Sequence, residues 1–239
     1  MSLPDPARLM AVLDATWPAL QVEDQGGWRL RDGGGGGKRV SATSALGPGG
    51  DIALAEAAQR ARGQAPLFRL TQDDPALDAA LAGQGYRMLD PTLLYAAPVA
   101  ELAQKPPPVR LFDIWPPLAI MRDLWAEGGI GPARLAVMAR APAPRTGFVA
   151  RIDDRVSGVG FVAIHDAVAM IHAIEIAPRA RRKRVATTLM RGAAHWAEAQ
   201  GADWFALAVT EANAPARALY EGLGMQIAGR YHYREGSPA

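Results

Sequence analysis

Residues 175–189 read Glu-Ile-Ala-Pro-Arg-Ala-Arg-Arg-Lys-Arg-Val-Ala-Thr-Thr-Leu, and this stretch indicates the fold. It is typical of a buried strand, a proline stop, a basic turn and the start of an amphipathic helix. The first N–H groups of a helix lack partners within the helix and lie at the positive end of its dipole. With cationic side chains beside them, they form a place that binds an anion, and a diphosphate fits it.

Composition excludes several classes of function. The chain has 239 residues, 49% of them hydrophobic, and a formal net charge of only +2, so it has no global basic field for nucleic acid. It has no cysteine, which excludes thiolate catalysis and thiolate metal ligands. Its four histidines show no metal-ligand spacing, and we expect no metal site. We see neither a signal peptide nor a membrane-spanning run, so a cytoplasmic protein without a membrane partner is expected.

A proline-rich segment divides the chain. Residues 98–108, with three consecutive prolines at the end, predict an extended linker between parts 1–97 and 109–239. In the first part we expect a helix near Leu9–Leu13, strands at 28–31 and 39–42, a helix at 51–62, a strand at 67–70, a helix at 74–82 and a strand at 86–95. In the second part we expect strands at 109–112, 148–152, 156–164, 167–176, 204–209 and 226–233, and helices at 118–125, 132–140, 185–200 and 214–221. This order predicts an α/β fold with a mixed, mainly antiparallel sheet flanked by helices.

The two parts resemble each other at an offset of 139 residues. This offset places Thr71 on Thr210 and Ala79 on Ala218, and it superposes the glycines of the two Gly-x-Gly stretches. Each part is predicted to end in strand, threonine, helix, Gly-x-Gly and strand. We therefore expect an internal duplication. It is imperfect, because Leu81 stands where the second copy has Tyr220.

The basic turn has two interpretations. Basic runs are often a solvated helix face or a nucleic-acid patch. However, cations at a helix N-terminus repel its dipole, and a bound anion would relieve that repulsion.

Two segments resemble the GNAT superfamily of N-acetyltransferases. The acyl-CoA signature of that family, Gln/Arg-x-x-Gly-x-Gly/Ala, falls on residues 181–186, where Arg181 and Ala186 match. Arg184 departs from the pattern because the family usually has glycine there. Residues 213–225 are similar to the family's Asn-x-x-Ala-x-x-Leu-Tyr-x-x-x-Gly-Phe segment, and only Met225 differs. The resemblance covers residues 109–239 and implies a catalytic domain there, with 1–97 as a degenerate second GNAT-like copy in tandem.

The resemblance implies roles for individual residues. It makes Tyr220 the general acid that protonates the departing CoA thiolate, although a core aromatic is the alternative. It makes Glu175 the general base, with a solvent-facing residue as the alternative and His172, on the opposite face of a regular strand, as the competing base. Asn213 is at least a helix cap. The residues expected to hold acetyl-CoA are Ile174, Ile176, Arg181, Arg182, Lys183, Arg184, Val185, Ala186, Thr187, Asn213 and Tyr220.

The Gly33–Gly37 run followed by Lys38 invites comparison with a phosphate-binding P-loop. The comparison fails because Asp32 stands at the first glycine position, Arg39 replaces Ser/Thr, and the following residues look strand-like. We expect a hairpin loop.

The sequence thus predicts an acetyl-CoA-dependent N-acetyltransferase that acts on a primary amine by direct attack. A noncatalytic acyl-CoA-binding regulatory module is the alternative, and a nucleic-acid-binding module is not expected. Trp125, Tyr231 and Tyr233 are possible pocket aromatics, although core or rim packing is the simpler expectation for each. The acceptor amine and the oligomeric state are not indicated.

Overall fold

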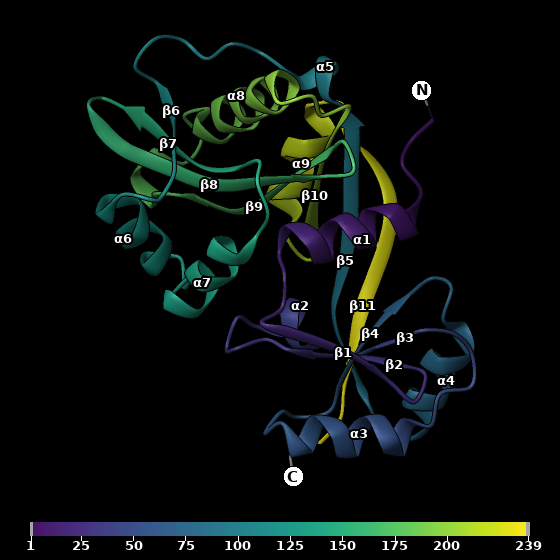
Figure 1. Cartoon of the computed structure of the whole chain (residues 1–239). Coiled ribbons are helices and arrows are strands. Elements are labelled where there is room, and N and C mark those ends of the chain that lie inside the picture. Colours follow the sequence, from purple (N-terminus) through teal and green to yellow (C-terminus); the bar gives the residue numbers. More distant parts are fainter. Residues whose placement is uncertain (1, 238–239) are drawn as a thin grey trace.

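The computed structural model describes residues 2–237. Its main feature is one eight-stranded sheet (Figure 1). The strands lie in the order β4 (Leu67–Thr71), β11 (Gln226–Glu235), β5 (Arg87–Pro98), β10 (Trp204–Thr210), β9 (Val168–Ile176), β8 (Arg155–His165), β7 (Arg145–Ile152) and β6 (Leu111–Ile114). All neighbours are antiparallel except β9 and β10. The predicted mixed, mainly antiparallel sheet is therefore confirmed.

Helices cover both faces of the sheet (Figure 1). One face carries α8 (Val185–Ala199) and α9 (Ala214–Gly222), and the other carries α1 (Pro6–Thr16), α6 (Ala119–Glu127) and α7 (Pro132–Arg140). Glycines on β7 and β8 allow close approach: a Cβ on Gly160 would lie 3.1 Å from Leu189 of α8, and one on Gly147 would lie 2.8 Å from Met121 of α6. The central strands β8 and β9 are consequently buried between the two helical layers.

The remaining elements of the first part form a smaller layer. A three-stranded sheet contains β1 (Gln21–Gln25), β2 (Trp28–Asp32) and β3 (Ser44–Ala45). Around it lie α2 (Lys38–Ser41), α3 (Ile52–Ala61) and α4 (Pro75–Gly83). Apolar residues of this layer, with Trp28, Phe68 and Leu81 at the centre, form a core of their own.

The two parts of the chain exchange strands within the large sheet. Strand β11 lies between β4 and β5, and β5 lies between β11 and β10. The register follows the offset seen in the sequence: Thr71 pairs with Tyr231, and the residues 139 positions away from each, Thr210 and Thr92, also pair. The other four pairs of β4 with β11 obey the same rule. The parts 1–97 and 109–239 are therefore joined through one sheet.

The segment 98–108 is not extended throughout. Val99–Leu102 form the short helix α5. The side chains at its two ends, Val99 and Leu102, are only 4% and 3% exposed. Residues three apart lie on one helix face, and both pack into the main core, where α5 lies against α8. The Val99 N–H donates to Asp203 O at 2.9 Å. The expected extended geometry is wrong for this stretch, because the three consecutive prolines that suggested it begin only at Pro106.

The expected strand at 39–42 is also wrong. Lys38–Ser41 form helix α2, with Gly37 as its N-cap at φ 95°. Val40 is 1% exposed, and a Cβ on Gly36 would lie 2.6 Å from Val137 of α7. Packing against α7 thus overrides the local strand preference. The strands that pair with β2 are instead β1, a wholly exposed and mainly polar segment, and the two-residue β3 that follows α2.

The glycine run is accordingly a strand-to-helix loop. This removes one argument against a P-loop, since a helix does follow. The other two stand, because Asp32 and Arg39 still occupy the positions of the required glycine and hydroxyl residue.

Candidate active site

A groove of about 410 Å³ runs along the start of α8. Its walls come from the end of β9, the basic turn, the first turn of α8 and one side of α9. Seven of the predicted cofactor-binding residues line it together with Ala180, Pro215, Ala218 and Leu219: these are Ile176, Arg181, Arg182, Arg184, Val185, Ala186 and Thr187. The groove therefore joins the two sequence segments that carried the family resemblance.

The backbone at the start of α8 adopts the conformation that glycine favours. Arg184 is the N-cap residue, in the left-handed region at φ 62° and ψ 15°, and Arg182 also has a positive φ of 63°. The Arg184 carbonyl accepts the first helical hydrogen bond, from the Thr188 N–H at 3.0 Å. No side chain of the described residues caps the helix. The N–H groups of the first turn are thus left for an external acceptor.

The cations of the basic turn are exposed and not neutralised by the chain. Arg181, Arg182, Lys183 and Arg184 are all exposed, and within residues 2–237 none has a carboxylate within 4.0 Å. Lys183 does not line the groove; it borders a separate cavity with Arg110 and Arg151. Three of the four cations therefore line the groove beside the unpartnered N–H groups of α8, a combination that suits a bound anion.

Strands β9 and β10 separate beside this groove. Their pairing starts at Val168 with Trp204 and ends at Ile171 with Leu207. Beyond that point, Thr210 of β10 pairs only with Thr92 of β5. At the separation Ala173 has φ 52°, and its carbonyl accepts from Trp125 Nε1 at 2.8 Å. The edges of Ile174 and Ile176 that face β10 consequently have no strand partner in the described chain, so their backbone groups are open to a ligand in the gap.

Glu175 lies in this open part of β9, against the end of α6. A Cβ on Gly128 would lie 2.3 Å from Glu175 Cδ, so the absence of a side chain at Gly128 leaves room for the carboxyl in its present position. Burial raises the pKa of the Glu175 carboxyl above its ordinary value, against the lowering effect of Arg181 and Arg134. A carboxylate of raised pKa is a better proton acceptor than an exposed one.

His172 is held neutral in the interior. It is 3% exposed, and burial together with nearby Arg39 holds its pKa well below the ordinary value. The Thr16 hydroxyl donates to Val12 O at 2.7 Å, so it accepts from His172 Nε2 at 2.8 Å. The lone pair of His172 Nδ1 then faces Arg39 Nη1 at 3.4 Å. The ring has a structural contact at both nitrogens, so it is a poor general base.

The bulge at Ala173 also places the side chains of His172 and Glu175 on the same face of β9. His172 pairs with Phe161 and Glu175 with Val159, two positions apart on β8. Residues two apart on a strand share a face, so His172 and Glu175 lie on the same face. The expectation of opposite faces held only for a regular strand, which β9 is not.

Tyr220 and Asn213 lie on α9. Tyr220 is 7% exposed, with its ring centroid 5.9 Å from that of Tyr95, and burial raises its pKa to about 12. Its hydroxyl is therefore protonated throughout the neutral range. Asn213 caps the helix by accepting from the Ala216 N–H at 3.2 Å. Neither residue lines the groove, although Ala218 and Leu219 beside Tyr220 do.

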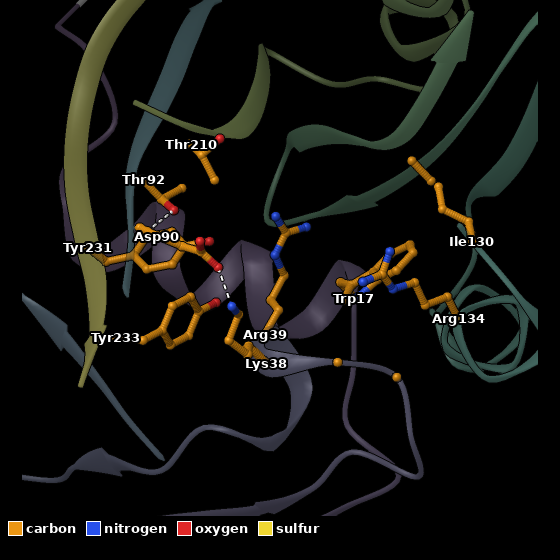
Figure 2. A pocket seen from close by; sticks show the side chains of 13 residues that line it. Trp17, Lys38, Arg39, Asp90, Thr92, Ile130, Arg134, Thr210, Tyr231 and Tyr233 are labelled. Carbon is orange, nitrogen blue, oxygen red and sulfur yellow. Dashed lines mark hydrogen bonds and ion pairs between the residues drawn. The ribbon is translucent and has the colours of Figure 1, made fainter. Parts of the chain in front are cut away.

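A second cavity, of about 250 Å³, opens where β9 and β10 separate, toward the face that carries α1 and α7 (Figure 2). Both parts of the chain line it: Trp17, Gly36, Gly37, Lys38, Arg39, Asp90, Thr92, Ile130, Arg134, Ala173, Thr210, Tyr231 and Tyr233. Two of the three aromatics singled out in the sequence are there, whereas Trp125 is fully buried in the core. The contributions of Trp17 and of residues 36–39 were missed, because no local pattern relates them to β9.

Comparison with known proteins identifies the class. The Acetyltransferase (GNAT) family model matches residues 108–225. This segment is similar to that family, whose members use acetyl-CoA as cosubstrate, and the chain is an acyltransferase with a GNAT fold.

Similar proteins match nearly the whole chain in sequence or in structure. The chain is 28% identical over 232 residues to an uncharacterized N-acetyltransferase, YobR, of Bacillus subtilis, covering 92% of this chain and 94% of that protein. It resembles the structure of a GCN5-related N-acetyltransferase from Kribbella flavida with a TM-score of 0.74 and 17% identity, over 100% and 98% of the two chains. A tandem GNAT protein from the clavulanic acid biosynthesis pathway is similar with a TM-score of 0.58 and 15% identity, over 98% and 89%.

Residues 2–237 contain no helix of the length and hydrophobicity needed to cross a bilayer. They also contain no cluster of three or more His, Asp or Glu side chains placed to hold a metal ion.

Proposed function

We propose that the protein is an acetyl-CoA-dependent N-acetyltransferase that moves an acetyl group to a primary amine by direct attack. The observation that carries the proposal is the groove at the start of α8, because it combines unpartnered helix N–H groups, three free cations and a left-handed turn. These are the donors that a diphosphate needs. The gap between β9 and β10 leads from this groove toward the second cavity, where the acceptor would enter.

The reaction needs two proton transfers. The amine nitrogen attacks the thioester carbonyl carbon, the C–S bond breaks, and the amide bond forms. Glu175, directly or through water, takes the proton that the amine loses, and Tyr220 gives its hydroxyl proton to the departing thiolate. Backbone N–H groups of β9 near Ile176 would donate to the carbonyl oxygen as it gains negative charge.

The first part of the chain has the counterpart of this groove without its chemistry. A cavity of about 480 Å³ lies between residues 45–52 and the start of α4, and no Lys or Arg lines it. The N-terminus of α3 is capped by the chain itself, since Asp51 Oδ1 accepts from the Ala53 N–H at 2.9 Å. A carboxylate there repels a phosphate, and Leu81 at the position of Tyr220 has no proton to donate. These features, with the strand register, support a degenerate, noncatalytic GNAT-like copy in tandem, with 98–108 as the connection.

A noncatalytic acyl-CoA sensor would show binding without turnover. We therefore propose to measure the melting temperature with and without acetyl-CoA, and then thiol release with a panel of amines. Acetyl-CoA at a hundred times its Kd should stabilise the protein by about 2.7 kcal/mol, which raises Tm by roughly 5–11 °C in a protein of this size. Unchanged Tm at saturating acetyl-CoA would refute the proposed site. Stabilisation without thiol release would favour the sensor.

A further inference from the structure

The second cavity, at the separation of β9 and β10, has an unbalanced charge. Three of its lining residues are cationic, Lys38, Arg39 and Arg134, and one is acidic, Asp90. Lys38 Nζ lies 2.6 Å from Asp90 Oδ2, so these two neutralise each other. Figure 2 shows this pair on one side of the cavity and the side chain of Arg39 extending into the space between that pair and Trp17. The guanidinium groups of Arg39 and Arg134 therefore give the cavity an excess of positive charge.

Neither guanidinium forms an ion pair with the described chain, although Arg134 is near enough to Glu175 to lower the pKa of that carboxyl. Within residues 2–237, no carboxylate lies within 4.0 Å of Arg39 or of Arg134. The polar contact of Arg39 with His172 goes to a neutral ring and brings no compensating charge. The Arg39 guanidinium is partly buried, and such a group without a counter-ion is unfavourable unless a ligand supplies one. Arg134 is exposed, so its charge is available to a ligand without this penalty.

The two arginines come from opposite parts of the chain and meet at one place. Arg39 is on α2 and Arg134 is on α7. The Arg134 guanidinium packs against the N-cap of α2, since a Cβ on Gly37 would lie 3.4 Å from its Nη2. Gly37 thus admits Arg134 beside the helix that carries Arg39. Hydroxyl side chains of Thr92, Thr210, Tyr231 and Tyr233 complete a polar lining.

We infer that the acceptor is a small amine that also carries a carboxylate, of the size of a single amino acid. This inference rests on the proposed acetyl transfer and names its acceptor class. The planar guanidinium matches a carboxylate in two parallel hydrogen bonds. A cavity of about 250 Å³ is below the range of about 300–1,000 Å³ typical of drug-sized ligands. The carboxylate lies between Arg39 and Arg134, and the amine points toward β9, where Glu175 stands.

The test compares acceptors that differ only in this carboxylate. Thiol release from acetyl-CoA is measured with the twenty amino acids, with their amides, and with O-phosphoethanolamine. We expect kcat/KM for the best amino acid to exceed that for its amide at least tenfold. Equal rates for acid and amide, or a preference for the phosphate compound, would overturn the inference while acetyl transfer itself stands.

Variants locate the effect. Arg134→Gln should lower the acid-to-amide ratio of kcat/KM about tenfold to a hundredfold, the loss expected for a charge-assisted hydrogen bond. The ratio is the proper readout because Arg134 also lowers the pKa of Glu175 and so affects every acceptor. Arg122→Gln, at an exposed arginine of α6 outside the cavity, makes the same charge change and should leave the ratio unaltered. An unchanged ratio in Arg134→Gln would contradict the assignment.

Arg39 is tested by two substitutions. Arg39→Gln should lower the acid-to-amide ratio as Arg134→Gln does, and Arg39→Lys, which keeps the charge but not the fork, should lower it less. If Arg39→Gln melts far below the wild type, Arg134→Gln, at an exposed position, decides the question alone.

A binding experiment separates this inference from the proposed function. N-acetylated amino acids, the expected products, should raise Tm in the absence of acetyl-CoA, and their amides should not. This result does not require turnover. If acetyl-CoA failed to bind but the N-acetylated acids still stabilised the protein over their amides, the carboxylate site would stand and the catalytic proposal would fall. No difference between acids and amides would refute the carboxylate site.

Discussion

Replacing Arg184 by glycine tests the backbone at the start of α8. Arg184 has φ 62° and ψ 15°, and its side chain is exposed, so truncation removes little packing. A residue with a Cβ in the left-handed region costs about 1–2 kcal/mol relative to right-handed backbone, and glycine avoids this cost. Glycine also gains freedom in the unfolded chain, which offsets about 0.5–1 kcal/mol.

The net expectation is that Arg184→Gly raises the free energy of unfolding by roughly 0.5–1 kcal/mol. In a protein of this size, such a gain corresponds to an increase in Tm of about 1–4 °C. Arg184→Ala is the matched control, because it removes the same guanidinium but keeps a Cβ at positive φ. We expect no increase in its Tm.

Both variants also report on the cofactor groove. Each removes an exposed cation from the lining, and a solvent-exposed ion pair contributes up to about 1 kcal/mol. We therefore expect the Kd for acetyl-CoA to rise by at most about fivefold in both.

Thermal unfolding followed by circular dichroism, with calorimetric titration of acetyl-CoA, measures the two effects separately. A Tm for Arg184→Gly no higher than that for Arg184→Ala would refute the argument from backbone strain. Wild-type affinity in both variants would show that the Arg184 guanidinium does not contact the diphosphate.

Three further predictions concern catalysis and the shared sheet. Tyr220→Phe should lower kcat about a hundredfold or more while the Kd for acetyl-CoA is kept; an unchanged kcat would remove Tyr220 from the mechanism. The Glu175 carboxyl can accept a proton only when it is ionised, so wild-type kcat/KM should rise as pH increases through its raised pKa. Glu175→Gln should shift this rise toward the pKa of the acceptor amine, about 10. An unshifted pH profile would point to another base. Residues 109–239 expressed alone should not fold stably, because β5 lies between β10 and β11; a cooperative thermal transition with full activity would contradict this.

Much of the fold could be predicted because its signals are local. The strand–turn–helix around Pro178 and Val185 and the helix between Asn213 and Gly222 depend on proline, glycine and apolar spacing within one or two turns. The structure places these elements where they were expected. The expected internal similarity is matched by the register, since pairs of β4 with β11 map onto pairs of β10 with β5 at the same offset.

Errors arose where tertiary contacts override local preference. The residues after Gly37 look like a strand, yet Val40 and Gly36 pack against α7 and hold a short helix. The bulge at Ala173 is equally invisible in an apolar run, although it decides that His172 and Glu175 share a face.

Local patterns in the chain indicated most of its helices and strands in order, the turn suited to a diphosphate, and Tyr220 and Glu175 as candidate catalytic residues. Only the three-dimensional packing decided that β5 of the first part lies between β10 and β11 of the second. It also decided that Arg39 contacts His172, which is 133 positions away in the sequence. The physical reason is that hydrogen-bond satisfaction and side-chain periodicity act between near neighbours in the chain. The neighbours of a strand and the walls of a cavity depend on which distant surfaces bury each other.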